Sequence, residues 1–357
     1  MVSGISRGVL SMLIKKFVFC ITFLLLNVSI GAEEALEISV AKLMHVEPKQ
    51  VELKKQTKGM TSSQSYSFTL NGKKYIVKIF AKKHSMEYRK KEIDVTKLFS
   101  DLGLGAKLVA IDDKNSLYIR EYLPGRTLKY KDLQDDKVLE NLAKAVQKLH
   151  KYKCTEQIKP ARKLLDRAEK HFQRISRKKI AAPSGFEKSY KKFRDLVKSL
   201  KVSDGFCHND LNPHNIILTP DMEIYFIDFG NSGSSNTYEE LGYLTLLNGI
   251  SGKKLEQFLT QYLGRKPTLD EISQVKLAQK LVCFVSSTVY FDFSESKKDK
   301  KLDLKTRIAN LDKLMKSHEV KPMLECIRTD EVVSVKSRRK DKVKQYAISC
   351  YKEFLEM

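Results

Sequence analysis

Apolar and polar residues alternate in two neighbouring segments of the first third of the chain. From Ser65 to Leu70 every second residue is large and apolar, which is the period of a strand with one buried face. Asn71-Gly72 follows, and both residue types tolerate the positive φ angles of a two-residue hairpin turn. Because residues 74–80 are again strand-like, the pattern predicts an antiparallel hairpin.

The apolar spacing then lengthens to that of a helix. Residues 85–101 place Ile93, Leu98 and Phe99 on the apolar face of a predicted amphipathic helix. Two further strands are expected at 106–111 and 116–123. Helical patterns dominate afterwards, at residues 137–151, 155–200, 254–317 and 346–355.

The predicted elements divide the chain into three parts. Residues 1–31 form a separate N-terminal segment, residues 32–124 a sheet with one helix, and residues 125–357 a mainly helical region. Residues 32–55 fit either a helix or an entry strand. The pattern therefore predicts both strands and helices, and 357 residues are sufficient for two packed lobes.

One short hairpin interrupts the helical region and carries the strongest chemical signal. His208-Asn209-Asp210 is followed by Asn215, and Asp228-Phe229-Gly230 stands after two short strands at 216–218 and 223–227. Each motif alone is more often a turn than a site. Joined by a hairpin, they would bring Asn215 and Asp228 to the same end, where one metal ion could contact both.

This arrangement is typical of kinase-type phosphotransferases. Phosphoryl transfer needs a carboxylate to accept the proton of the attacking hydroxyl, and Asp210 can supply it. Hard oxygen ligands must hold Mg²⁺ against the phosphates of ATP, and Asn215 and Asp228 can supply those. We expect His208 to brace the loop.

A lysine on the return strand of the first hairpin is the second signal. Lys78 shares a face with Ile76 and Phe80, which is unusual for a solvated side chain. We expect it to hold the ATP phosphates, with an edge lysine whose stem lies along the surface as the alternative. In the arrangement of kinase-type phosphotransferases, a glutamate of the following helix pairs with this lysine. Glu92 is the expected partner, Glu87 is its rival, and a solvated helix face is the alternative.

The loop around Asp210 resembles that of the choline/ethanolamine kinase and aminoglycoside phosphotransferase superfamily. Asparagine rather than arginine follows the histidine, and residues 102–128 are also similar to that superfamily. The resemblance implies a two-lobed protein-kinase-like fold of the α+β class, with a small antiparallel-sheet N-lobe and a mainly helical C-lobe. It also implies an ATP-dependent kinase that phosphorylates a small-molecule alcohol.

Further site residues follow from the resemblance alone. The serine- and threonine-rich segment 59–64 corresponds to the loop over the nucleotide phosphates, which implies nucleotide contacts from Gly59, Ser62 and Ser63. Glu121 and Leu123 correspond to the hinge that meets the adenine. Glu240-Leu241 stands where the superfamily often has aspartate-leucine. His150, at the end of the helix 137–151, has no evident partner, and we interpret it as structural.

The resemblance makes choline, ethanolamine or a similar amino alcohol the expected acceptor. An aminoglycoside-type or protein-directed kinase and a non-catalytic pseudokinase are the alternatives, and the complete set of motif residues argues against the last. A quaternary ammonium would suit an aromatic cage. The segment Phe284 to Phe293 is aromatic and acidic, but core packing of a helix is the favoured interpretation of it.

The net charge of +23 suits anionic partners, yet no nucleic-acid-binding motif accompanies the dispersed lysines, so a solvated basic surface is favoured. Lys15-Lys16 precede the apolar run 17–30, which ends in small residues. This fits a signal peptide that exports the chain, or a membrane anchor if it stays uncleaved. The scattered cysteines instead suit a reducing environment.

Overall fold

The computed structural model describes residues 34–56, 63–112, 114, 116–153, 164–334 and 336–357. The predicted signal peptide or anchor at 1–31 lies outside these residues, as do Gly59 and Ser62 of the predicted phosphate loop. The chain forms two compact units. The first contains the described residues up to Ile93 together with Lys107–Tyr122, and the second contains Asp94–Ala106 and Leu123–Met357.

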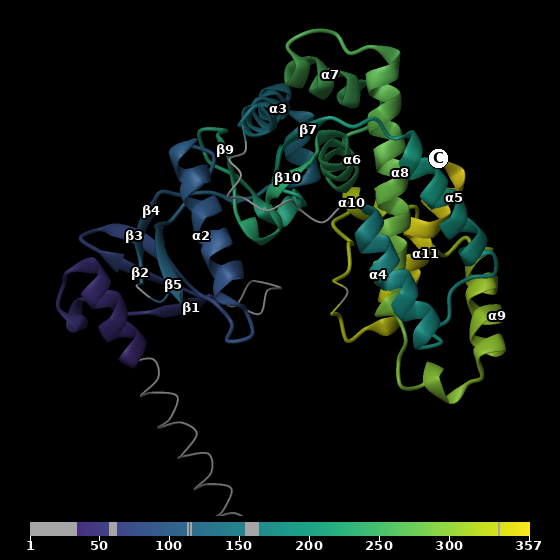
Figure 1. Ribbon diagram of the computed structural model, residues 1–357, viewed down its shortest axis with the longest axis horizontal. Coiled ribbons are helices and arrows are strands. Elements are labelled where there is room, and N and C mark those ends of the chain that lie inside the picture. The colour runs from purple at the N-terminus through teal and green to yellow at the C-terminus, as the bar shows by residue number, and fades with distance from the viewer. Residues whose placement is uncertain (1–33, 57–62, 113, 115, 154–163, 335) are drawn as a thin grey trace, which may run out of the picture. The chain divides into compact units, whose positions relative to one another are not determined.

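The first unit is built on a five-stranded antiparallel sheet in the order β1-β2-β3-β5-β4 (Figure 1). Its strands are β1 (Lys54–Gln56), β2 (Gln64–Leu70), β3 (Lys73–Ile79), β4 (Leu108–Ile111) and β5 (Leu117–Glu121). The turn between β2 and β3 has positive φ at both Asn71 (49°) and Gly72 (75°). The hairpin predicted from alternation and Asn-Gly is therefore confirmed, because the primed turn matches the twist of the strands.

Helices accompany this sheet. Residues 34–44 form a helix, which decides between the two expectations for 32–55, and its Val40 is buried with Phe68 and Ile119 of the sheet. The predicted helix at 85–101 is α2 (Met86–Asp101), and the boundary between the two units falls inside it. Within the first unit, Ile93 of α2 packs with Phe80 and Tyr118.

The second unit is mainly helical. Its helices are α3 (Asp136–His150), α4 (Leu164–Arg177), α5 (Phe186–Ser199), α6 (Thr237–Leu247), α7 (Gly252–Leu263), α8 (Leu269–Asp292), α9 (Leu304–Met315), α10 (Met323–Arg328) and α11 (Lys340–Glu356). Its strands are β6 (Arg126–Thr127), β7 (Asp204–Cys207), β8 (Ile216–Leu218), β9 (Ile224–Phe226) and β10 (Gly233–Asn236). This distribution confirms the expected α+β class.

The strands of the second unit form two small antiparallel sheets that position the loops described below. β7 pairs with β10, and β8 lies between β6 and β9. The β8–β9 hairpin predicted from sequence is confirmed, with Ile216 opposite Phe226 and a turn closed by Met222 N–H donating to the Thr219 carbonyl at 3.0 Å. The residues that precede β8 and those that follow β9 therefore lie at the same end of the hairpin.

Helix α8 is the longest helix of the second unit and lies alongside α4, α6 and α11 (Figure 1). The core around it is rich in stacked aromatic rings, among them Phe186, Phe193 and Phe284. A second core joins α3, α6 and α7 to the short strands. A membrane-spanning helix is absent from the part of the chain that the structure describes.

Candidate active site

Lys78 of the first unit forms a buried ion pair with Glu92. Lys78 lies on the central strand β3, between Ser65 of β2 and Tyr118 of β5, and its relative exposure is 9%. Its ammonium contacts the Glu92 carboxylate, and the Tyr118 hydroxyl donates to the same carboxylate at 3.3 Å. Glu87, the rival partner, is exposed. The structure thus places a buried cation on the sheet and fixes its partner.

The other predicted nucleotide-binding residues that the structure describes, Ser63, Glu121 and Leu123, are less enclosed. Ser63 is half-buried in a bend that directly precedes β2. Glu121 ends β5, where its N–H donates to the Lys107 carbonyl at 2.9 Å and its carboxylate pairs with Lys73 at 2.6 Å. Leu123 belongs to the second unit, and its carbonyl accepts the Gly125 N–H at 2.9 Å.

The predicted catalytic loop follows β7 in the second unit. Asn209 has a φ of +63°, a conformation that asparagine adopts more readily than most residues. This explains why asparagine and not a bulkier residue follows His208. Asn212 then caps the short helix Pro213–Asn215, because its side-chain oxygen accepts the His214 N–H at 3.0 Å.

Asp210 is held from two sides. Its backbone carbonyl accepts the side-chain amide of Asn215 and the backbone N–H of Asn212, both at 2.8 Å. Its Oδ1 accepts the Asn212 side chain at 3.0 Å and the Tyr243 hydroxyl at 2.8 Å. The half-buried carboxylate therefore has a defined orientation, with one oxygen engaged by two neutral donors.

Asp228 adjoins this loop through backbone hydrogen bonds. The Ile227 N–H donates to the Asn215 carbonyl at 3.0 Å, and the buried His208 ring donates from Nε2 to the Ile227 carbonyl, also at 3.0 Å. Asp228 has a φ of +67°, a conformation that costs free energy for a residue other than glycine. Strain of this kind is often found at functional sites, and here it falls on an expected metal ligand.

The carboxylate of Glu240, on α6, anchors the same loop. It accepts hydrogen bonds from the backbone N–H groups of His208, at 3.1 Å, and of Asn209. It also contacts Nε2 of His150 at 2.8 Å, while Nδ1 of that ring lies 2.9 Å from the Tyr262 hydroxyl. Burial alone would raise the pKa of Glu240, but the His150 hydrogen bond and neighbouring donors hold it below its ordinary value.

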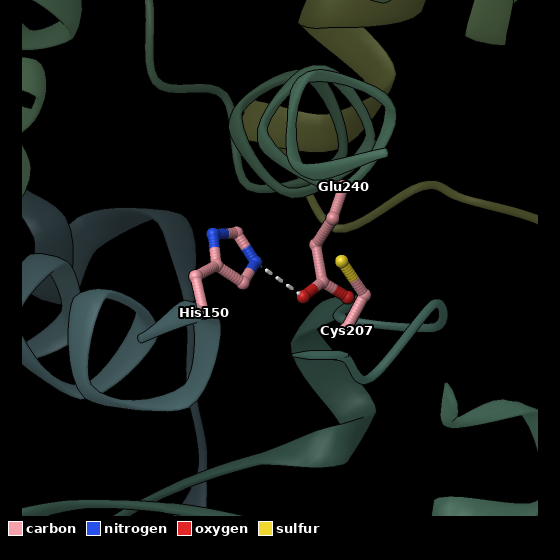
Figure 2. Close-up of side chains that lie close together, drawn as sticks. All are labelled: His150, Cys207 and Glu240. Carbon is pink, nitrogen blue, oxygen red and sulfur yellow. Dashed lines mark hydrogen bonds and ion pairs between the residues drawn. The ribbon is translucent and has the colours of Figure 1, made fainter. Parts of the chain in front are cut away.

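His150, Cys207 and Glu240 resemble a metal-binding group, because their donor atoms all lie within 4.8 Å of one another (Figure 2). Metal binding would require the thiolate form of the cysteine. Burial, followed by the charge of Glu240, raises the pKa of the Cys207 thiol well above its ordinary value. His150 and Glu240 already have hydrogen-bond partners, so we interpret the group as a structural support for the loop.

The aromatic segment at the end of α8 is mainly core, as the favoured interpretation predicted. Phe284 and Phe291 are fully buried. The Arg174 guanidinium lies 5.3 Å from the centre of the Phe293 ring, and its Nε is 3.1 Å from the Asp292 carboxylate. A cation from the protein therefore already contacts both the ring and the acid, which favours core packing over a cage for a quaternary ammonium.

Several residues that shape the site were not singled out in the sequence analysis. Tyr243 contacts Asp210, and the Asn248 side chain donates to the Leu211 carbonyl at 3.0 Å. Tyr243 stands three residues after Glu240, so both lie on one face of α6. That spacing is the signal that could have identified it. The partners of His150 had no comparable signal.

The sequence and fold of this chain are similar to those of known proteins. The sequence pattern of the choline/ethanolamine kinase family matches residues 53–243. No match was found among curated protein sequences.

Solved structures share the fold. A choline/ethanolamine kinase family protein from Mesorhizobium loti aligns with a TM-score of 0.60 and 16% identity, covering 83% of this chain and 99% of that one. A choline kinase from Streptococcus pneumoniae aligns with a TM-score of 0.58 and 22% identity, covering 79% and 96%. An ADP-bound aminoglycoside phosphotransferase aligns with a TM-score of 0.55 and 14% identity, covering 72% and 92%. The expected kinase-like fold is confirmed.

Proposed function

Since this chain belongs to the choline/ethanolamine kinase family and is a kinase that phosphorylates an alcohol group of a small molecule, we propose that it transfers the γ-phosphoryl group of ATP to choline, ethanolamine or a similar amino alcohol. One observation carries the proposal. The Asn215 side chain and the Ile227 backbone join the Asp210 loop to the Asp228 loop, so a carboxylate base and two oxygen ligands stand together in the second unit.

We assign the proton transfer to Asp210. Its half-buried carboxylate accepts the hydroxyl proton of the acceptor as the oxygen attacks phosphorus. Lys78, kept in place by Glu92, binds phosphate oxygens of ATP. His208 braces the loop through the Ile227 carbonyl. These roles require little covalent chemistry from the protein, because positioning and charge stabilisation supply most of the catalysis of phosphoryl transfer.

The donor atoms around the loop fit Mg²⁺. The side-chain nitrogen of Asn215 is committed to the Asp210 carbonyl, so its amide oxygen is the atom left for a cation. The Asp228 carboxylate adds a second hard oxygen donor. We therefore propose Asn215 and Asp228 as the ligands of Mg²⁺, which when bound would neutralise negative charge on the phosphates of ATP.

The charge of the second unit favours an amino alcohol over an aminoglycoside. Helices α4 and α5 carry nine lysine and arginine residues against four acids. One of them, Arg167, lies 5.8 Å from the centre of the ring of Tyr243, whose hydroxyl contacts Asp210. A polycationic acceptor at Asp210 would be repelled by this charge more strongly than an acceptor with one positive charge. The choline kinase and the choline/ethanolamine kinase family protein found by structural comparison support the same class of acceptor.

The test is an acceptor panel with the purified full-length chain. We expect ATP- and Mg²⁺-dependent formation of a phosphomonoester from choline or ethanolamine, detected by phosphorus NMR, and much slower transfer to an aminoglycoside and to a serine peptide. Preferential phosphorylation of the aminoglycoside or the peptide would overturn the assignment of the acceptor. Absence of transfer to every acceptor would overturn the proposed activity.

A further inference from the structure

The hydroxyl of Tyr243 is the one side-chain contact to Asp210 that comes from outside its own loop, among the contacts found in the described residues. It donates to Oδ1 of Asp210 at 2.8 Å, and Asn212 donates to the same oxygen at 3.0 Å. No donor contacts Oδ2 in the described part of the chain. The two oxygens of the carboxylate are therefore in different environments.

Tyr243 is held firmly enough to act as a fixed donor. It lies three residues after Glu240 on α6, and Glu240 is bonded to the backbone of the same loop. The Arg167 guanidinium of α4 lies 5.8 Å from the centre of the Tyr243 ring. Burial, then the negative charge of Asp210, raises the pKa of the Tyr243 phenol well above its ordinary value. The hydroxyl consequently keeps its proton at neutral pH.

We propose that Tyr243 is a positioning residue for the phosphoryl transfer. By occupying Oδ1 it fixes the rotation of the Asp210 carboxylate and presents Oδ2 to the acceptor. The proton of the acceptor hydroxyl passes to Oδ2 as the new oxygen–phosphorus bond forms and the bond from phosphorus to the leaving ADP oxygen breaks. This inference rests on the proposed function, because it takes Asp210 as the proton acceptor.

The geometry also argues against a simpler role for this tyrosine. An aromatic ring beside the base could serve as a wall for the ammonium of an amino alcohol. Arg167 already lies over the Tyr243 ring, so a second cation there would meet a like charge. The hydroxyl and not the ring is therefore the part of Tyr243 that we expect to matter for turnover.

The test is Tyr243→Phe in the full-length chain, which removes the hydroxyl and keeps the ring. We expect kcat on the best acceptor to fall by about tenfold to a hundredfold, which is the effect of losing one hydrogen bond to a charged group. KM for ATP and for the acceptor should stay within about twofold of the parent, because binding contacts are untouched. An unchanged kcat would overturn the proposal.

Tyr225→Phe is the matched control. Its hydroxyl also donates to a carboxylate at 2.8 Å, that of the exposed Glu223, which directly precedes β9. Tyr225→Phe should retain the kcat of the parent. The midpoint temperatures of unfolding of the two variants should agree to within a few degrees. If both variants lose the same activity, the effect is not specific to Asp210 and the proposal fails.

A double variant separates positioning from general damage. If Tyr243 acts through the Asp210 carboxylate, Tyr243→Phe should cost nothing further in an Asp210→Asn background. A multiplicative loss in the double variant would contradict the proposal. Failure of the proposed function would be seen in a different experiment. If the parent chain transfers phosphate to no acceptor, the role of Asp210 is refuted without any change at Tyr243.

Discussion

The carboxylate of Glu240 accepts the backbone N–H of His208 at 3.1 Å, so a residue of α6 fixes the loop that carries Asp210. His150 contacts the same carboxylate from α3 (Figure 2). The side chain of Glu240 thus reaches both the loop and α3. The catalytic loop is thereby joined to two helices of the second unit through one buried acid.

Replacing this acid should weaken folding in a pH-dependent way. Glu240→Gln places an amide nitrogen against buried donors, and we expect a loss of about 1–3 kcal/mol in the free energy of unfolding at neutral pH. Because folding lowers the pKa of Glu240, its contribution is present above the ordinary value of 4.5 and is lost as pH falls through the lower folded value. Denaturant unfolding at pH 7 and pH 4 should show the smaller difference at pH 4. Exposed Glu256→Gln is the control, and an equal loss at both pH values would contradict the account.

Lys78 should affect both stability and turnover, and a double variant should separate the two. Lys78→Met leaves Glu92 buried without its cation, which we expect to cost about 3–5 kcal/mol. Adding Glu92→Gln removes the stranded charge and should restore most of the thermal stability. Turnover should stay low in both variants, because Lys78, and not Glu92, is the member of this pair that we expect to bind the phosphates of ATP. Exposed Lys74→Met on the same strand is the control. Recovery of turnover in the double variant would show that the lysine is structural.

Asp228 should matter for metal and much less for folding. Asp228→Asn removes a carboxylate from the proposed Mg²⁺ site, so we expect Mg²⁺ to lose its effect on the affinity for ATP in titration calorimetry. Removing Mg²⁺ from the parent with a chelator should give the same low affinity. Asp221→Asn, in the exposed turn of the same hairpin, should behave like the parent. A Mg²⁺ response that survives in Asp228→Asn would assign the metal elsewhere.

The parts of the fold that local patterns specify could be predicted from sequence. Alternation and Asn-Gly fixed the β2–β3 hairpin, and two strands around a four-residue turn brought Asn215 next to Asp228. Lys78 could be identified from the period of a strand. Its pairing with Glu92 was expected from the arrangement of kinase-type phosphotransferases and not from periodicity.

Contacts between distant helices could not be predicted in the same way. His150 meets Glu240 only because α3 and α6 pack around β7, and periodicity gives the buried face of a helix but not its neighbour. Tyr243 differs, because its spacing of three residues from Glu240 on α6 could have identified it as a residue of the same helix face. Its contact with Asp210 still depends on how α6 packs. The aromatic run at the end of α8 left two interpretations open until Arg174 was located beside Phe293.

Asp210→Asn tests the central claim most directly. The substitution keeps the shape of the side chain and removes the basic oxygen, so the affinity for Mg²⁺ and ATP should be preserved. The measurement is kcat for phosphomonoester formation on the best amino alcohol, compared with the parent and with exposed Asp204→Asn of the adjoining strand. We predict a fall of about two orders of magnitude or more, the usual contribution of a positioned acid–base group. Turnover equal to that of the parent would contradict the assignment of this loop as catalytic.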